Sequence, residues 1–328
     1  AYADTVTADT RVATILHTSP VTGMGMDLPA IVAAIRAKSP DCFIIVDGIQ
    51  HASHGHIDLK AAPVDAYVIS PYKVFSRHGY GIAWVSDRLS ALPHDALIGG
   101  PSGNWELGTR DTGAYATMSD VVAYFEWRGE QVPEATDSRA KIEAAAAAIH
   151  AHEHALTDAM LYGTGNLTGL SEMDGVTIVG GVDNPAREGL VSFHSATKPS
   201  AQIVEELEGE GIRVHIRKAD HYSGNILNPL GQANCIRVSM CHYNTEAEVA
   251  QFLQAKTAFA KMPSMGAAGK GADFSKSMQQ SMIYMMPLFM VFIAWNLPAG
   301  LALYWVVTML FSLGQQLVVN KTFSSNKA

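Results

Sequence analysis

Apolar and polar positions alternate along the first third of the chain in blocks typical of strands and helices. Residues 12–23 (VATILHTSPVTG) predict a strand that runs into a turn, and Leu28–Lys38 predicts an amphipathic helix with Asp27 as its N-cap. Residues 43–50 (FIIVDGIQ) and 64–85 (VDAYVISPYKVFSRHGYGIAWV) each begin as an apolar run and end in polar residues, as buried strands do. The order strand, helix, strand, strand predicts an α/β fold with a parallel sheet.

From residue 117 onward the pattern changes to helices and short strands. Residues 121–127 and the Ala-rich segment 138–161 predict helices. The β-branched runs VTIVGG, GLVSFHS, GIRVHIRK and CIRVSMC are separated by turn residues and by a predicted helix at residues 200–208. A last amphipathic helix is expected from residue 246 to about residue 259. Together these elements predict a small α+β domain.

The composition changes near the C-terminus, where residues 277–320 contain no Asp, Glu, Lys or Arg. This run is about twice the ~20 residues that one bilayer crossing requires, and residues 296–300 (NLPAG) interrupt it. It predicts two transmembrane helices, with a lipid bilayer as partner; a buried soluble hairpin is the alternative. Lysines precede and follow the run, which predicts that both of its ends are cytoplasmic.

Net charge and cysteine content exclude some classes of protein. The formal net charge is −8 and there is no basic patch, which argues against nucleic-acid binding. The three cysteines, Cys42, Cys235 and Cys241, are scattered without metal-ligand spacing, which indicates a reducing compartment and no disulfide framework. Residues 1–10 carry no signal-peptide pattern.

Polar side chains end the two central apolar runs and suggest a chemistry. Asp47 and Gln50 end the first run, and Lys73 ends the second. A carboxylate and an amine so placed are the pair that holds pyridoxal phosphate (PLP). The amine forms a Schiff base with the aldehyde, and the carboxylate keeps the pyridine nitrogen protonated. Taken alone, a Lys after a strand is more often a solvated loop lysine.

The flanking residues support the cofactor interpretation. VDGIQ followed by a strand ending in SPYK resembles the cofactor core of the class V aminotransferases, the fold-type I group that includes the cysteine desulfurases. The resemblance implies that Asp47 pairs with the pyridine nitrogen, Gln50 meets the ring hydroxyl and Lys73 carries the cofactor. It also implies that Ser70 contacts the phosphate. Tyr72, a further candidate for the phosphate, stands where many members have His.

Two further segments resemble the same family. ELGT, at residues 106–109, resembles the segment whose Thr reaches the phosphate of the partner subunit, so Thr109 is expected to act across a homodimer interface; an ordinary Gly-rich turn is the alternative. IRVS followed by HYNT resembles the C-terminal signature whose Arg binds the amino-acid carboxylate. The guanidinium of Arg237 presents a planar fork suited to that group, although a surface salt bridge would explain an Arg here as well.

The reaction subtype stays open at this point. A persulfide-forming cysteine should lie on an exposed loop and have a lowered pKa. All three cysteines head or follow apolar runs, so we expect them to be packed. DGIQHASHGHIDL and YKVFSRHGYGIAWV resemble the desulfurase-like branch, which leaves transaminase, lyase and racemase chemistry open. The histidines of residues 51–56 have no carboxylate or second His at helical spacing, so we expect no metal site there.

The apolar tail resembles a second family. MMPLFMVFIAWNLPAGLALYWVVTMLFSLGQQ is similar to the last two membrane helices of the YidC-type membrane protein insertases. The expected organisation is therefore a partial PLP-binding large domain, linking helices with a small domain, a linker, two membrane helices and a polar tail, at residues 1–116, 117–260, 261–276, 277–320 and 321–328.

The resemblance to the class V enzymes begins inside their large domain, at about residue 10. The first strands of that domain and its phosphate-gripping loop have no counterpart in it. The leading hypothesis is a PLP-dependent enzyme that acts on an amino acid through Lys73, at the inner or plasma membrane with its soluble part cytoplasmic. It would be cytoplasmic if the tail were an artefact. The alternatives are an insertase fragment or an inactive chimera.

Overall fold

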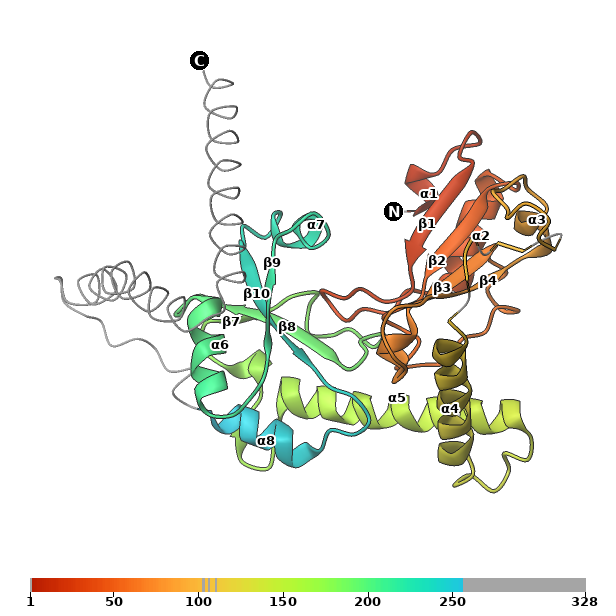
Figure 1. Ribbon diagram of the computed structural model, residues 1–328. Helices are drawn as coiled ribbons and strands as arrows, with labels where there is room; N and C mark the ends of the chain where they lie inside the picture. The colour runs from red at the N-terminus through yellow and green to blue at the C-terminus, as the bar shows by residue number, and fades with distance from the viewer. Residues whose placement is uncertain (1, 102–103, 106, 110, 256–328) are drawn as a thin grey trace, which may run out of the picture. The chain divides into compact units, whose positions relative to one another are not determined.

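The computed structural model describes residues 2–101, 104–105, 107–109 and 111–255, which form two four-stranded sheets and the helices that cover them (Figure 1). The predicted transmembrane hairpin, its linker and the polar tail lie outside the described residues. No helix in the described part of the chain is long and apolar enough to cross a bilayer.

The first sheet has the strand order β1-β2-β3-β4. Its strands are Val12–Leu16, Phe43–Asp47, Ala66–Ile69 and Ile82–Val85. β1, β2 and β3 are parallel, as predicted, whereas β4 is antiparallel to β3. The prediction of a parallel sheet is wrong for this strand. A parallel return needs a crossover, usually a helix, and the β3–β4 connection holds only the 3₁₀ helix η1 (Pro71–Val74) and a turn.

Helix α2 (Leu28–Lys38) covers one face of this sheet. It begins where predicted, with the Asp27 carboxylate accepting a hydrogen bond from the N–H of Ala30 at 3.0 Å. Its buried residues Leu28, Val32 and Ile35 pack into one core with the strand residues Ile15, Ile44 and Val46. The sheet also exposes apolar side chains, namely Val12, Leu16, Val68 and Trp84.

The second sheet is antiparallel, with the order β7-β8-β10-β9. Its strands are Val176–Ile178, Leu190–Ser195, Asn234–Ser239 and His215–Lys218. Helices α6 (Ser200–Gly209) and α8 (Glu246–Gln254) bury Ile203, Leu207, Val249 and Phe252 against it. These strands and helices have the α+β arrangement expected for this part of the chain. Short elements complete the chain: α1 (Tyr2–Thr5), α3 (Asp87–Ser90), α7 (Gly224–Leu227), the hairpin of β5 (Gly163–Thr164) and β6 (Leu167–Thr168), and η2 (Leu170–Glu172).

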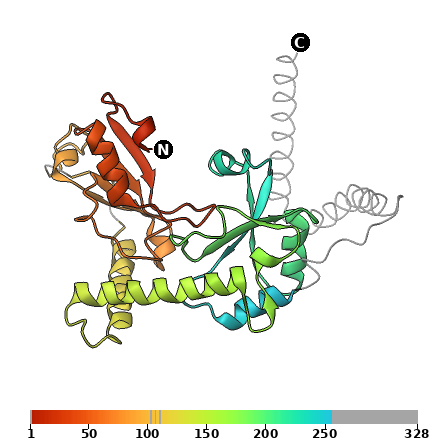
Figure 2. The ribbon, with the colours of Figure 1, turned by 180° about the vertical axis from the view of Figure 1, so that it is seen from behind.

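One long helix serves both sheets. Helix α5 (Ser138–Tyr162) packs its first half against α4 (Thr112–Gly129), where Ile149 shares a core with Val121 and Phe125. Its second half places Leu156 and Met160 in the core of the second sheet. Both ribbon views follow α5 from one sheet to the other (Figures 1 and 2). The linking helix predicted from the Ala-rich segment is confirmed in position and length.

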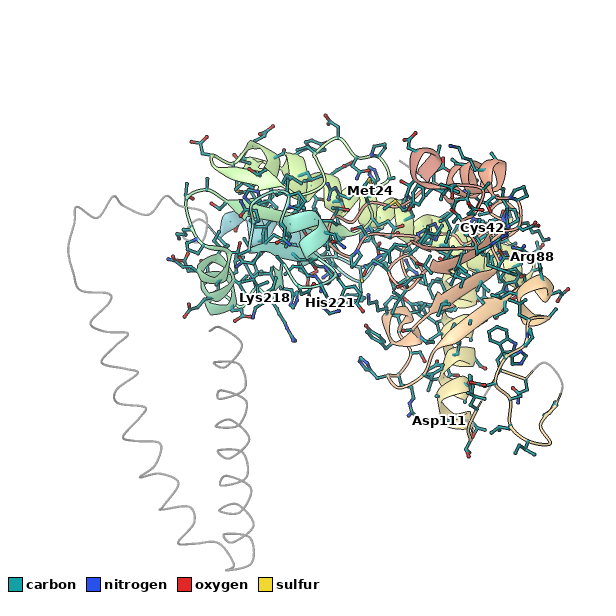
Figure 3. The ribbon with its side chains drawn as sticks, turned by 90° about the horizontal axis from the view of Figure 1, so that it is seen from above. Met24, Cys42, Arg88, Asp111, Lys218 and His221 are labelled. Carbon is teal, nitrogen blue, oxygen red and sulfur yellow. The ribbon has the colours of Figure 1, made fainter. Side chains whose placement is uncertain are left out.

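The loop after β1 also connects the two sheets. The N–H of Gly25 donates to the carbonyl of Ala186 at 2.7 Å, and the N–H of Glu188 donates to the carbonyl of Gly23 at 2.9 Å. The buried guanidinium of Arg187 donates to the carbonyl of Thr22 at 2.5 Å. Figure 3 shows Met24 of this loop on the side of the second sheet, away from Cys42 and Arg88 of the first. The loop therefore fixes the end of β1 against the segment that precedes β8.

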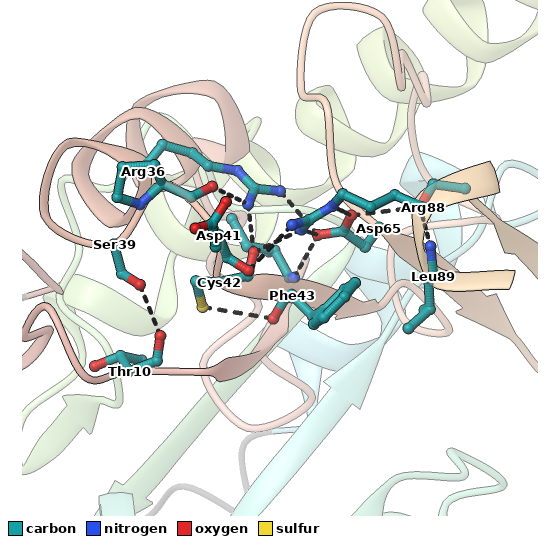
Figure 4. Close-up of polar contacts among 12 residues, drawn as sticks. Thr10, Arg36, Ser39, Asp41, Cys42, Phe43, Asp65, Arg88 and Leu89 are labelled. Carbon is teal, nitrogen blue, oxygen red and sulfur yellow. Dashed lines mark hydrogen bonds and ion pairs between the residues drawn. The ribbon is translucent and has the colours of Figure 1, made fainter. Parts of the chain in front are cut away.

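A buried carboxylate anchors the amino ends of β2 and β3 (Figure 4). Asp65, just before β3, accepts hydrogen bonds from Arg36 and Arg88, each at 2.8 Å, and from the N–H of Ile44 at 2.8 Å. Burial alone would raise the pKa of Asp65, but the hydrogen bonds from Arg88, Ile44 and Arg36 outweigh it and hold the pKa below its ordinary value. Because the unfolded state then binds more protons in acid, this stabilisation is present above pH ~4 and is lost as the pH falls further.

We expect Asp65→Asn to lower the free energy of unfolding at neutral pH by about 2–3 kcal/mol, because it leaves two arginines without their carboxylate. Urea unfolding followed by circular dichroism measures the loss. Asp41→Asn, at an exposed carboxylate beside this network, is the matched control and should stay within about 0.5 kcal/mol of wild type. Equal stabilities of the Asp65 variant and wild type would contradict this role.

Candidate active site

Asp47 ends β2 and faces the open side of the first sheet. Its side chain lines a depression of about 460 Å³ together with residues of β1 and β3, and with Ser70. Its Oδ1 accepts a hydrogen bond from the N–H of Ile49 at 3.1 Å, which fixes the carboxylate at the mouth of the depression. The side chain is otherwise exposed, so a carboxylate is available to an incoming cationic group.

The residue after Asp47 has to be glycine. A Cβ on Gly48 would lie 2.1 Å from the ring of Tyr67, which packs against the backbone at this point. The hydroxyl of Tyr67 lies 2.7 Å from Nδ1 of His17, at the end of β1. The Gly of the VDG segment thus leaves room for the Tyr67 side chain, whose hydroxyl reaches His17.

Lys73 lies on η1, one short turn beyond β3, and points back toward β2. Its Nζ donates to Oε1 of Gln50 at 3.1 Å. Burial and the positive charge of Arg237 lower its pKa, and Asp47 opposes the shift. The turn ends in a backbone that L-residues rarely adopt, with Phe75 at φ 66°. Since such a conformation persists only where the surroundings over-determine it, the position of Lys73 is firmly set.

Arg237 approaches the same place from β10 of the second sheet. Its Nε is buried and has no hydrogen-bond partner within the described residues. Burial and the charge of Arg217, on β9, lower the pKa of Arg237, so its cationic form lacks a compensating anion. Arg217 itself donates to Ser223 Oγ at 2.6 Å. We call Lys73, Arg217 and Arg237 the cation cluster.

Gln50 is held by a second set of polar side chains. Its Nε2 lies 3.3 Å from Nε2 of His54, and Nδ1 of His54 lies 2.6 Å from Oε2 of Glu153 on α5. All three side chains are buried. With Oε1 accepting from Lys73, the amide of Gln50 donates to His54, so the His54 proton is on Nδ1 and is donated to Glu153. A continuous chain of hydrogen bonds therefore runs from Lys73 to Glu153.

A parallel histidine–carboxylate pair lies beside the first. Nδ1 of His51 is 2.5 Å from Oε1 of Glu188, and its Nε2 donates to the carbonyl of His56 at 3.0 Å. The His51 ring stacks on His17 with 3.5 Å between centroids. Burial, and then the charge of His51, lower the pKa of His17 to about 3. His17 is therefore neutral in the folded protein at physiological pH.

Comparison with known proteins agrees with this geometry. The family model Aminotransferase class-V matches residues 1–252. The chain belongs to the class V aminotransferase family. Members of this family, including the cysteine desulfurases, are PLP-dependent.

The relatives of this class V chain include proteins named as cysteine desulfurases and one named as aminotransferase-like. A probable cysteine desulfurase of Pseudomonas putida is 29% identical over 75% of this chain and 58% of its own length. An aminotransferase-like protein of Gibberella zeae is 29% identical over 76% of this chain and 59% of its own. This chain thus spans less than two thirds of the length of these relatives. Its fold is that of the apo cysteine desulfurase of Thermococcus onnurineus, with a TM-score of 0.59 at 19% identity over 75% of this chain and 59% of that one.

A second family model, 60Kd inner membrane protein, matches residues 221–327. Residues 256–327 of this match lie outside the described residues. The two matches share residues 221–252. This shared part contains β10, which is hydrogen-bonded to β8 on one side and to β9 on the other. The structure therefore assigns that shared part to the small domain of the class V fold.

The structure gathers some of the predicted site residues more closely than others. Lys73 contacts Gln50 and is close enough to Asp47 and Arg237 for their charges to affect its pKa. Tyr72 is exposed, with its ring stacked on His78 at 4.4 Å between centroids. Ser70 lines the depression beside Asp47. Thr109 is exposed in its loop, so its assignment to a partner subunit's phosphate stays a prediction.

The sequence analysis missed Arg217, His54 and Glu153. Arg217 lies directly opposite Cys235 in the sheet register, next to Arg237, and no local sequence pattern indicates this neighbour. His54 was noticed only as part of a histidine-rich turn, because its carboxylate partner is 99 residues away.

The cysteines are packed, as the sequence analysis expected. Cys42 and Cys235 are fully buried, and Cys241 is half-buried. Burial raises the pKa of the Cys235 and Cys241 thiols. A persulfide-forming thiol is exposed and has a lowered pKa, so neither property is found here.

His17 should make the protein sensitive to mild acid. Its pKa is about 6.5 in the unfolded chain and about 3 when folded, so between these values the unfolded state binds the extra proton and stability falls as the pH falls. From pH 7.5 to pH 5 we expect wild type to lose about 2 kcal/mol more than His17→Gln. Urea unfolding at both pH values tests this. The exposed His56→Gln should behave like wild type, and an unchanged pH dependence in His17→Gln would contradict the assignment.

Proposed function

We propose that this chain binds PLP through Lys73 and acts on the amino group of an amino-acid substrate. The observation that carries the proposal is the cation cluster, which places a half-buried amine and two arginines near Asp47 at the end of β2, with no anion bonded to the Nε of Arg237 among the described residues. PLP and an amino acid together supply a phosphate, an aldehyde and a carboxylate. These are the groups that such a cluster would bind.

The residues divide between the two ends of the cofactor. Asp47 holds the pyridine nitrogen and Gln50 the ring hydroxyl, while Ser70, Tyr72 and, from a partner subunit, Thr109 serve the phosphate. The orphaned Nε of Arg237 and the lowered pKa of Lys73 fit the substrate end. When bound, PLP supplies an electron-accepting ring that stabilises negative charge at the substrate α-carbon.

The residues of this chain would supply binding and proton transfer. Arg237 would orient the substrate by its carboxylate, and Gln50 keeps the Nζ of Lys73 in place by the 3.1 Å hydrogen bond. The lowered pKa leaves more of Lys73 as free amine at neutral pH, so its Nζ can accept the α-proton and return it. Because all three thiols are packed, we propose chemistry on the amino acid itself, by transamination or elimination, without a persulfide on a cysteine of this chain.

A spectroscopic titration of the full chain with PLP tests the proposal. Wild type should develop a saturable visible absorption band, and Lys73→Ala should develop none, because only an amine at this position is in reach of the aldehyde. The exposed Lys60→Ala is the matched control and should retain the band. Absence of the band in wild type would refute cofactor binding and leave the inactive-chimera alternative.

The carboxylate role of Arg237 is tested separately. We expect Arg237→Ala to keep the PLP band but to weaken the affinity for the amino acid, read from its effect on that band, by about 30–160-fold, the loss of one charge-assisted contact of about 2–3 kcal/mol. Arg237→Lys should recover only part of it, because a lysine cannot form the two parallel hydrogen bonds. Arg213→Ala, an exposed arginine on the segment before β9, is the control. Wild-type amino-acid affinity in Arg237→Ala would refute the role.

A second candidate function has one observation in its favour, the match of residues 221–327 to the 60Kd inner membrane protein family. A membrane-insertion component of that type would fractionate with membranes and keep its activity in Lys73→Ala. Recovery of the chain in the membrane fraction together with loss of amino-acid chemistry in Lys73→Ala would favour a membrane-attached PLP enzyme instead.

A further inference from the structure

Three metal-ligating side chains from separate elements meet beside Gln50. They are His54 in the turn after β2, Glu153 in the middle of α5, and Cys241 in the turn after β10, and their ligand atoms all lie within 4.8 Å of one another. The expectation of no metal here rested on the lack of partners at helical spacing, whereas the partners lie far away along the chain. The fold brings the second and third ligands from 99 and 187 residues further along the chain (153 − 54 and 241 − 54).

One oxygen of the cluster has no hydrogen-bond partner. Glu153 is only 1% exposed; its Oε2 is hydrogen-bonded to His54, whereas its Oε1 is buried without a partner within the described residues. A buried carboxylate oxygen left unpaired costs free energy, typically 1–3 kcal/mol. It is therefore an unused acceptor on a carboxylate whose side chain meets an imidazole and a thiol.

We propose that His54, Glu153 and Cys241 form a binding site for a divalent metal ion of the Zn²⁺ class. An imidazole nitrogen, a carboxylate oxygen and a thiolate are the three donor types that Zn²⁺ takes in proteins, with a water or a further ligand in the fourth position. Tetrahedral Zn²⁺ at its usual bond lengths separates such donors by about 3.3–3.6 Å. The three donor atoms already lie within 4.8 Å of one another, and Nδ1 of His54 and Oε2 of Glu153, which are 2.6 Å apart, would have to separate by about 1 Å to admit the ion.

The turn that carries Cys241 is preformed. The N–H of Cys241 donates to Oδ1 of Asn244 at 2.8 Å, and the N–H of Asn244 donates to the carbonyl of Cys241 at 2.8 Å. The other two ligands are held by the turn after β2 and by the interior of α5, both ordered by packing. An ion would therefore add a further link among three segments that are joined here by the His54–Glu153 hydrogen bond and by that of His152 Nε2, on α5, to the carbonyl of Asn244 at 2.9 Å.

A metal ion bound at this site would change the hydrogen bonding of Lys73. A metal on Nδ1 of His54 places the ring proton on Nε2, so Gln50 must offer its carbonyl oxygen to His54 and withdraws it from Lys73. The ion would thus change the hydrogen bonding of the amine proposed to hold PLP. This coupling rests on the proposed function; the metal site does not.

A cobalt titration of the full, metal-stripped chain without PLP tests the site. Co²⁺ occupies zinc sites and reports thiolate ligation by a charge-transfer band. Wild type should bind one Co²⁺ with that band and lose it on addition of one equivalent of Zn²⁺. Cys241→Ser and Glu153→Gln should each weaken binding by at least about 100-fold, because removing a ligand costs more than the 10–100-fold typical of an outer partner.

Matched variants distinguish the loss of a metal ligand from a loss of folded structure. Glu153→Gln keeps the size of the side chain and a hydrogen bond to His54, so loss of metal with an unchanged circular dichroism spectrum assigns Glu153 as a ligand. His56→Gln and Cys235→Ala remove the neighbouring histidine and another thiol, and both should bind Co²⁺ as wild type does. Absence of the thiolate band in wild type, or wild-type binding in Cys241→Ser and Glu153→Gln, would overturn the proposal whether or not PLP binds.

Discussion

The arrangement of the site depends on two buried histidine–carboxylate pairs that tie the turn after β2 to distant parts of the chain. His54 is bonded to Glu153 on the long helix, and His51 to Glu188 just before β8. Both carboxylates are at most 5% exposed, where a hydrogen bond to an ionisable partner is stronger than at the surface and a lost partner is costly. Since Gln50 lies in the same turn, its position relative to the second sheet follows from these two contacts. They add to the packing of α5 and to the bonds of the loop after β1, which also hold the first sheet to the second.

This constraint explains how a site can be built from two separate cores. The first sheet contributes Asp47, Gln50 and Lys73, and the second contributes Arg217 and Arg237. Each set is fixed locally, the first by parallel strand ends and the second by antiparallel register. The histidine–carboxylate pairs and the loop after β1 then bring the sets together, and α5 passes through both cores.

Most of the local structure could be predicted from the sequence, because its causes are local. The N-cap at Asp27, the Ala-rich helix α5 and the alternation of the small-domain strands all depend on neighbouring residues. The direction of β4 and the bonds of Asp65, His54 and Glu188 could not be predicted, since each depends on residues brought near by the fold. The candidate site shows the same division. Asp47 and Gln50 came from one apolar run, Lys73 from the next and Arg237 from a recognisable signature, whereas Arg217 and Glu153 had no signal in their own surroundings.

The positive charges of the cation cluster match the negative charges of PLP and an amino-acid substrate, the ligands proposed for it. Lys73, Arg217 and Arg237 bring three formal positive charges into a partly buried space, and Asp47 is the acidic group that acts on Lys73 there. Burial and mutual repulsion lower the pKa of Lys73 and of Arg237, so the cluster is stabilised by whatever anion enters it. A substrate carboxylate supplies one negative charge, and the phosphate of PLP supplies the remainder. Binding of the substrate carboxylate is the role proposed for Arg237. Guanidinium groups held by neighbouring strands suit it, because their donors are already oriented and little entropy is lost when the anion binds.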